Sequence, residues 1–331
     1  RKRIAGRYAK ERRFRLIGLG AVVLSAAFLA FLLFTMMGNG LRGFTRTEIA
    51  LTVDFPASPL LLDPAAITDE SLNQANLPMA WITIRDAIKA DPSILSRTET
   101  IALPASTGID LAAKSEGPPE AEAAVARLEK AGVLTTGFNW NFLSASDGTD
   151  PAQVGIWGAF KGTLLTMLVT LLLSFPVGVA TALYLEEYAP KAWWTDIIEV
   201  SINNLAAVPS IIFGLLGLSI FLNLLHLPRS AALVGGMTQV VFQHVLPLAL
   251  PGILTGTIIG MARALGETAP LLMIGMRAFI ATPPGGISDP ATVLPVQIFL
   301  WSDEVSKGFV EKTSAAIIVL LAFLLAMNGL A

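Results

Sequence analysis

Long uncharged stretches alternate with polar ones along the chain. Residues 16–37 are uncharged, and residues 162–185 form a second such stretch. About 20 apolar residues cross the hydrocarbon core of a bilayer, so both stretches predict membrane-spanning helices. A third span is predicted over about 200–225, a fourth within 244–276 and a last one from about Ala315. Residues 277–313 read as a polar loop, and we expect its 287–301 portion to lie along the surface. The pattern indicates a mostly α-helical, polytopic membrane protein.

Residues 38–156 have the composition of a soluble domain and carry eight basic and fifteen acidic residues. Alternating apolar positions predict a strand over 47–55, and helical spacing predicts helices over 71–90 and 120–130. We therefore expect an α+β domain inserted after the first span, outside the membrane. Its sequence contains no metal cluster, nucleophile triad or phosphate loop.

Composition and charge indicate the class of protein and the orientation of its amino terminus in the membrane. The chain is 53% hydrophobic and 15% charged, with a mean hydropathy of +0.65, which indicates an integral membrane protein. Residues 1–15 contain eight basic residues and one acidic residue. By the positive-inside rule this tail is cytoplasmic, and residues 16–37 are longer than a typical signal-peptide core. The absence of cysteine excludes disulfides and thiol redox chemistry.

One apolar stretch carries charge. Residues 244–276 contain Arg263 and Glu267, which a helix starting at Pro251 would place inside the bilayer on one helix face. Small residues surround the pair and would let neighbouring helices approach closely: Gly256, Gly260, Ala262, Ala264, Gly266 and Ala269. The pair could fix helix register. Alternatively, Arg263 could meet an anionic substrate, because a guanidinium matches oxyanions and charge inside a membrane is usually functional.

The count of spans indicates a gap in the chain. With a cytoplasmic amino terminus, three spans place Leu227 outside, and the His244 end of the next helix would then also lie outside. A further span is needed, yet the stretch ending at Gly236 is far shorter than the roughly 20 residues required. We predict that a span is missing between Gly236 and Met237. The chain begins with Arg1 and ends in an apolar run, so we expect both ends to be trimmed.

Two stretches resemble the PstA permeases of phosphate-specific ABC importers. They are VLPLALPGILTGTIIGMARALGETAPLLMIG at 245–275 and GTLLTMLVTLLLSFPVGVATALYLEEYAP at 162–190. The GETAP run, residues 266–270, is fairly specific to phosphate permeases. The resemblance covers about residue 160 to the end, and the first helix with the following domain resembles an extension on some members.

The resemblance implies a type I ABC importer (MetI-like) permease core over 157–331, with six core-type spans in the bacterial inner membrane. It also implies a PstC-like second permease, two PstB-like ATPases that carry Mg-ATP, and a periplasmic PstS-like phosphate-binding protein. No cofactor is expected on this chain, which lacks a G-x-x-x-x-G-K-[ST] loop. We expect no catalytic residue, no metal and no nucleic-acid partner.

Permeases of this kind carry a cytoplasmic coupling loop with the pattern E-A-A-x3-G-x9-I-x-L-P. Leu246 and Pro247 fit its end, but His244 replaces the isoleucine and Pro228 to Ser230 stand where E-A-A is usual. The core of the loop is therefore missing at the same junction as the predicted span. The surviving part of the ATPase coupling segment consists of Gln239, Gln243, His244 and Pro247.

The sequence thus predicts a permease subunit of an ATP-driven phosphate importer and not an enzyme. Arg263, Glu267 and Thr268 are the predicted pathway residues: Arg263 would donate to phosphate, and Glu267 would hold Arg263 in position. Two alternatives stay open. The permease could carry another oxyanion, molybdate or sulfate, because arginine does not itself choose among tetrahedral anions. A secondary transporter is the other alternative, and it would need inverted repeats that the sequence does not show.

Overall fold

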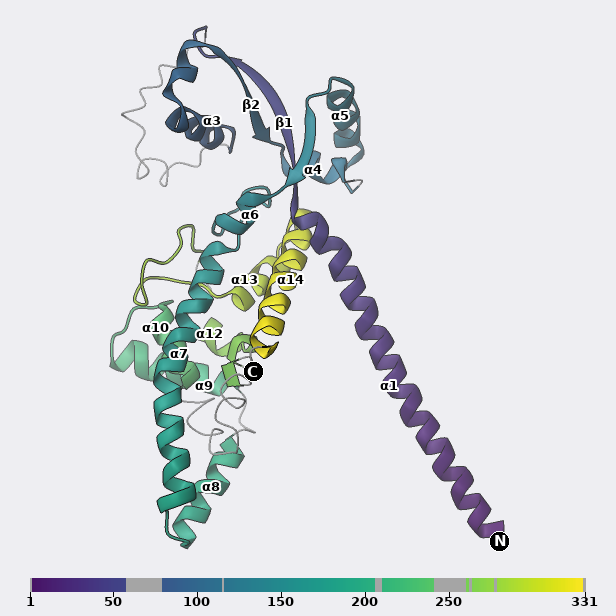
Figure 1. The fold of residues 1–331 in the computed structure, drawn as a ribbon, viewed down its shortest axis with the longest axis vertical. Helices are drawn as coiled ribbons and strands as arrows, with labels where there is room; N and C mark the ends of the chain where they lie inside the picture. The colour runs from purple at the N-terminus through teal and green to yellow at the C-terminus, as the bar shows by residue number, and fades with distance from the viewer. Residues whose placement is uncertain are drawn as a thin grey trace.

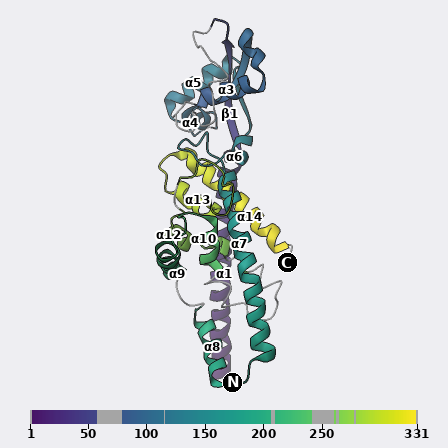
Figure 2. The ribbon, with the colours of Figure 1, turned by 90° about the vertical axis from the view of Figure 1, so that its left-hand side faces the viewer.

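The computed structural model describes residues 2–57, 79–114, 116–205, 210–240, 260–261, 264–276 and 279–329. These residues form a mostly helical, elongated molecule with its β-strands gathered at one end (Figure 1). Figure 2 shows the same arrangement turned by 90°. Among the described residues, three helices are long and apolar enough to cross a membrane: Phe14–Gly43, Trp157–Leu183 and Lys307–Gly329.

Helix α1 (Lys2–Gly43) contains the first of these candidate spans. Its apolar side chains are exposed, and Figure 1 shows the helix diverging from the other helices toward its amino terminus. Only its carboxyl end packs, against α14 (Lys307–Gly329). A Cβ atom added at Gly43 would lie 2.9 Å from Cβ of Ala315, so the close approach of the two helices requires glycine here.

A three-stranded antiparallel sheet follows α1, with β1 (Thr45–Asp54) between β2 (Thr98–Pro104) and β3 (Leu134–Phe138). The strand predicted over 47–55 is therefore confirmed. A small apolar core lies beside the sheet and consists of Phe55, Ile88, Ile94 and Ile101.

Short helices connect and flank these strands. They are α3 (Met79–Ala90), the 3-10 helix η1 (Pro92–Ser96), α4 (Thr107–Ala113), α5 (Pro119–Lys130) and α6 (Trp140–Ser144). The helix predicted over 120–130 is confirmed as α5, which buries Val125. The helix predicted over 71–90 is described only from Met79, because residues 58–78 lie outside the described part.

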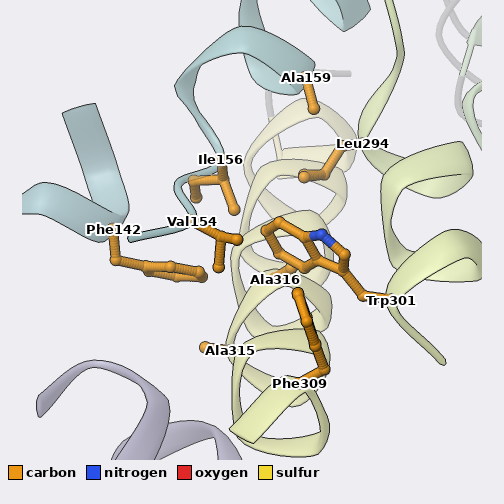
Figure 3. Packing of buried hydrophobic residues seen from close by; sticks show 9 residues of the cluster. All are labelled: Phe142, Val154, Ile156, Ala159, Leu294, Trp301, Phe309, Ala315 and Ala316. Atoms are coloured by element: carbon orange, nitrogen blue, oxygen red, sulfur yellow. The ribbon is translucent and has the colours of Figure 1, made fainter. Parts of the chain in front are cut away.

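The remaining elements form the helical body. They are α7 (Trp157–Leu183), the π-helical turn η2 (Tyr184–Tyr188), α8 (Trp193–Leu205), α9 (Ser210–Gly217), the π-helical segment η3 (Leu218–Leu224), α10 (Ala232–Gln239), α12 (Ala269–Met273), α13 (Leu294–Ser302) and α14. A core joins α6, α7, α13 and α14 (Figure 3) and consists of Phe142, Val154, Ile156, Ala159, Leu294, Trp301, Phe309, Ala315 and Ala316. Residues before Trp157 thus help to fix the amino-terminal part of α14.

The predicted span over 200–225 is described in two parts. Residues 200–205 belong to α8, and residues 210–224 belong to α9 and its π-helical continuation η3. Residues 206–209 lie outside the described part, so the continuity of the span stays a prediction. Residues 287–301 were predicted to lie along the surface, but they contain α13, whose Leu294, Val296 and Trp301 are buried. Apolar burial outweighs the polar flanks that suggested a surface loop.

The last span also starts earlier than predicted, at Lys307 instead of about Ala315. Its first turns bury Glu311 and Lys312, each 3% exposed. Nζ of Lys114, at the end of α4, lies 3.0 Å from Oε2 of Glu311 and 2.8 Å from Oδ2 of Asp110. We call Asp110, Lys114 and Glu311 the ionic junction. It ties the sheet-containing part to α14, since buried charges are stable only when paired.

Candidate functional site

The structure describes some of the predicted site residues. Four lie outside the described residues, and their predicted roles stay predictions: Gln243, His244, Pro247 and Arg263. Three are described: Gln239, Glu267 and Thr268. The candidate site is therefore built around these three and the elements that hold them.

The charged stretch is not one continuous helix. Residues 264–266 are helical, but Glu267 and Thr268 leave the helix before α12 begins at Ala269. Pro270 stands in the first turn of α12, where its missing N–H is tolerated, and a proline disfavours helix in the preceding residues. Backbone outside a helix at membrane depth is tolerated only where it is buried in protein or lines a cavity. At the predicted membrane depth, the break would therefore place Glu267 and Thr268 against protein or beside a cavity.

Gln239, the last residue of α10, bridges α7 and the charged stretch. The Thr170 hydroxyl donates to Gln239 Oε1 over 3.0 Å, and Gln239 Nε2 donates to the backbone oxygen of Ala264 over 2.9 Å. Gln239 is 4% exposed. A buried amide left without partners costs about 1–3 kcal/mol, so these two bonds hold α10 against both neighbours. Its predicted role in ATPase coupling stays a prediction.

One face of α7 carries four buried hydroxyls, which we call the hydroxyl face: Thr163, Thr166, Thr170 and Ser174, each at most 2% exposed. Their spacing of three and four residues aligns them along about 16 Å of helix. The opposite face presents exposed leucines at Leu168 and Leu172. The helix is therefore apolar outward and polar inward, as expected of a spanning helix that packs its polar face against protein.

The four hydroxyls are not equally satisfied. Thr163 donates to Ala159 O over 2.8 Å and accepts from Leu294 N over 2.8 Å, which satisfies the first turn of α13. Thr170 reaches Thr166 O over 2.8 Å as well as Gln239. Within the described residues, the hydroxyls of Thr166 and Ser174 have no hydrogen-bond partner.

A small space lies beside the hydroxyl face. Its volume is about 10 Å³, and it is lined by Thr163, Thr166, Met167, Gln239, Leu265, Leu271, Val293 and Pro295. This volume corresponds to roughly one water molecule. The described lining combines neutral hydrogen-bond donors on one side with apolar side chains on the other.

A second cavity of about 390 Å³ lies near the other end of α13, lined by Asp147, Gly148, Thr149, Phe279, Leu300, Trp301, Asp303, Glu304 and Phe309. Burial raises the pKa of Asp147, although Trp301 Nε1 donates to its carboxylate over 3.0 Å. Among the described residues, no group of three His, Cys, Asp or Glu side chains could hold a metal ion.

The sequence analysis missed the hydroxyl face. Its signal was present, since hydroxyl residues recur at 163, 166, 170 and 174 in an otherwise apolar stretch. Uncharged polar residues in an apolar stretch are weak evidence for a functional face. A threonine in a helix can instead bond to the backbone of its own helix. Within the described residues, the two cases are distinguished by the unpartnered hydroxyl of Thr166 and by the two hydrogen bonds of Gln239.

The comparisons with known proteins cover parts of the chain. Residues 1–81 match a family model described as a domain of unknown function, DUF3333. The chain is similar to phosphate transport system permease protein PstA 1 of Mycobacterium tuberculosis (strain ATCC 25618 / H37Rv), with 30% identity over 155 residues, 36% of this chain and 50% of the relative. No solved structure matches the chain.

Two further relatives extend the similarity. Phosphate transport system permease protein PstA of Yersinia pestis is 26% identical over 225 residues, 57% of this chain and 75% of the relative. Probable ABC transporter permease protein YqgI of Bacillus subtilis (strain 168) is 27% identical over 208 residues, 49% of this chain and 71% of the relative. The predicted resemblance to phosphate-system permeases is confirmed as a similarity, and the chain spans about half the length of the M. tuberculosis relative.

The alignments also contain more positions than the residues of this chain that they cover. The 225-position alignment with the Y. pestis protein occupies only 57% of a 331-residue chain, so that relative has residues opposite gaps. The alignments do not say where the gaps fall. The segment predicted to be missing between Gly236 and Met237, which are consecutive residues of α10, stays a prediction.

Proposed function

We propose that this chain is a transmembrane permease subunit of an ATP-driven inorganic phosphate importer. The observation that carries the proposal is the similarity to proteins named as phosphate transport system permeases in M. tuberculosis and Y. pestis. Three candidate spans among the described residues support a membrane location. The substrate and the partners are part of the proposal, because the similarity covers only part of the chain and of its relatives.

The proposed protein lies in the bacterial inner membrane with its amino terminus in the cytoplasm. The basic residues 1–15 support this orientation. The sheet-containing part then stands outside the membrane, since one candidate span, α1, separates it from the basic tail. The helical body would adopt the type I (MetI-like) permease arrangement and form the pathway together with a second permease.

ATP hydrolysis belongs to partner subunits in this proposal, and the chain itself is not an enzyme. Two ATPases would bind on the cytoplasmic side, and a periplasmic phosphate-binding protein would deliver the anion. Arg263 would offer paired donors to phosphate, and Glu267 would keep that arginine from trapping the anion. The break in the helix at Glu267 and Thr268 supports a pathway role, because discontinuous helices often surround transport sites.

Uptake measurements in the native host test the proposal. We expect deletion of the gene to abolish high-affinity uptake of radiolabelled phosphate, and re-expression of the chain to restore it. Uptake of sulfate and molybdate serves as the control for substrate class. Unchanged phosphate uptake together with lost sulfate or molybdate uptake would replace phosphate by the other oxyanion. ATP-independent uptake by the purified chain alone in vesicles would contradict the ABC permease assignment.

A further inference from the structure

We propose that the hydroxyl face of α7, together with Gln239, is the surface along which a tetrahedral oxyanion passes. The inference rests on the proposed permease function and deepens it, because it assigns the passage to neutral donors in addition to the predicted arginine. In the structure α7 and α10 are in contact along this surface, beside a space of about 10 Å³. The passage would open when α7 and α10 move apart.

The unpartnered hydroxyls are the first argument. Thr163, Thr170 and Thr181 all donate to the carbonyl four residues earlier in α7, as hydroxyls in helices commonly do. Thr166 and Ser174 do not, although they are only 2% and 0% exposed. An unmet buried donor costs about 1–3 kcal/mol. A polar ligand bound at the face would satisfy both hydroxyls, which no described group of the protein satisfies.

The location of Thr166 is the second argument. Thr166 lines the small cavity together with Gln239 and Thr163, so this buried residue adjoins the space between α7 and α10. Close packing here depends on Gly236, where an added Cβ atom would lie 2.5 Å from Cγ1 of Val169 and 3.1 Å from Thr166 O. The glycine lets the two helices approach closely over the cavity.

The chemistry of the donors is the third argument. An oxyanion that leaves water needs hydrogen-bond donors to replace its hydration. Hydroxyl and amide groups provide them without a fixed positive charge, so the anion is bound weakly enough to move on. At present the Thr170 hydroxyl donates to Gln239 Oε1, and Gln239 Nε2 donates to Ala264 O. When the helices separate, the same donors become available to the anion.

Cysteine accessibility tests the proposal, because the chain contains no cysteine. Thr166→Cys, Thr170→Cys and Ser174→Cys would each be made in the full chain, in membranes that contain its partner subunits. A small, charged methanethiosulfonate would be added with and without ATP, and modification would be read as a mass shift. We expect modification during turnover and about tenfold slower modification with saturating phosphate, as for a site that phosphate occupies.

Two positions on α7 provide matched controls for that experiment. Leu172 is 63% exposed on the opposite face, and Thr181 bonds to its own helix. We expect Leu172→Cys and Thr181→Cys to be insensitive to phosphate. Thiols at 166, 170 and 174 that stay unmodified during active transport, or that react at the same rate with and without phosphate, would overturn the passage while leaving the proposed function intact.

Substitution provides the second measurement. Thr166→Val keeps the side-chain shape but removes the hydroxyl, and Thr166→Ser retains it. We expect Thr166→Val to lower phosphate uptake about tenfold at equal amounts in the membrane, the effect of losing one hydrogen bond to a charged group. Thr166→Ser and Thr181→Val should transport normally. Normal uptake by Thr166→Val would overturn the inference, whereas failure of the wild-type chain to support phosphate uptake would overturn the proposed function.

Discussion

At the scale of single residues, the polar groups inside the helical body separate into two kinds. Gln239 and Thr170 bond to each other and hold three segments together. Thr166 and Ser174 have no such partner in the described part of the chain. The first kind stabilises one closed arrangement, and the second is available to a ligand. Predictions at this scale therefore concern what a side chain binds and at which protonation state.

Arg263 is the residue whose predicted role can be tested most directly. We expect Arg263→Gln to reduce phosphate uptake at least about tenfold, because the glutamine has no charge and lacks the forked donors of the guanidinium. Phosphate uptake by the Arg263→Lys variant should lie between that of the wild type and that of Arg263→Gln, since lysine keeps the charge but lacks the forked donors. Arg229→Gln, at an exposed position, is the control. Normal uptake by Arg263→Gln at normal expression would remove Arg263 from the pathway.

Asp147 should make stability depend on pH. Burial raises its pKa above the ordinary value of 3.8, so folding favours the protonated form. The ionised carboxylate therefore opposes folding once the pH exceeds the raised pKa. We expect Asp147→Asn to raise Tm at neutral pH, and the gain to shrink as the pH falls toward the ordinary value. Thermal unfolding in detergent at both pH values checks this.

The control for that experiment is Asp303→Asn, because Asp303 lines the same cavity but is exposed. Its effect on Tm should be small and similar in acid and at neutral pH. A Tm for Asp147→Asn below that of the wild type at neutral pH would show that the charge of Asp147 is stabilising, contrary to the expected direction.

At the scale of elements, the sequence predicts long apolar helices well and their interruptions poorly. The spans at 16–37 and 162–185 fall within α1 and across α7 with its π-helical continuation, because an uncharged run of that length has few other stable states. The break at Glu267 and the burial of α13 depend on tertiary packing, which hydropathy does not contain. The pathway arginine itself stays a prediction from sequence.

The ionic junction shows the same limitation. Lys114 lies in a stretch of soluble composition, and Glu311 lies in a stretch that reads as a polar loop. Neither hydropathy pattern indicates that Lys114 and Glu311, which are 197 positions apart, form a pair. The pairing arises because the end of α4 and the start of α14 meet where α1 ends. Contacts of this kind become visible only once the chain is folded.

The junction predicts a large effect of one substitution. Lys114→Met leaves Asp110 and Glu311 as buried carboxylates without their shared cation, which costs about 3–5 kcal/mol when one partner of a buried pair is removed. We expect a clearly lower Tm. In a triple variant that also carries Asp110→Asn and Glu311→Gln, Tm should rise back toward the wild-type value, because the uncompensated charges are then gone. Lys130→Met, at the exposed end of α5, should leave Tm unchanged.

At the scale of the whole molecule, the described residues form two parts, and each part has its own apolar core. The sheet-containing part has its own apolar core of Phe55, Ile88, Ile94 and Ile101. The helical body has a separate core to which Phe142 and Val154 also belong, although both fall within the predicted outer domain of 38–156. The independently packed outer part is thus narrower than that range, and it ends near the strands β1 and β3.

This division predicts where the chain can be cut. Thr45 and Phe138 face each other as antiparallel partners at the ends of β1 and β3, so a short glycine-serine turn can join them. We expect a chain lacking residues 46–137 to insert into the membrane and to keep its helical body, because Phe142 and α14 retain their packing. Protease protection and far-ultraviolet circular dichroism would measure insertion and helix content.

The matched control for that deletion removes residues 46–156 instead. It also takes away Phe142, Val154 and Ile156, which are at most 3% exposed against α13 and α14. Losing a buried phenylalanine alone costs about 3–5 kcal/mol, so this longer deletion should destabilise the helical body even where the shorter one does not. Equal stability of the two deletions would mean that residues 139–156 belong with the outer part. Loss of insertion in the shorter deletion would show that the ionic junction, which it also removes, is required for the spans to assemble.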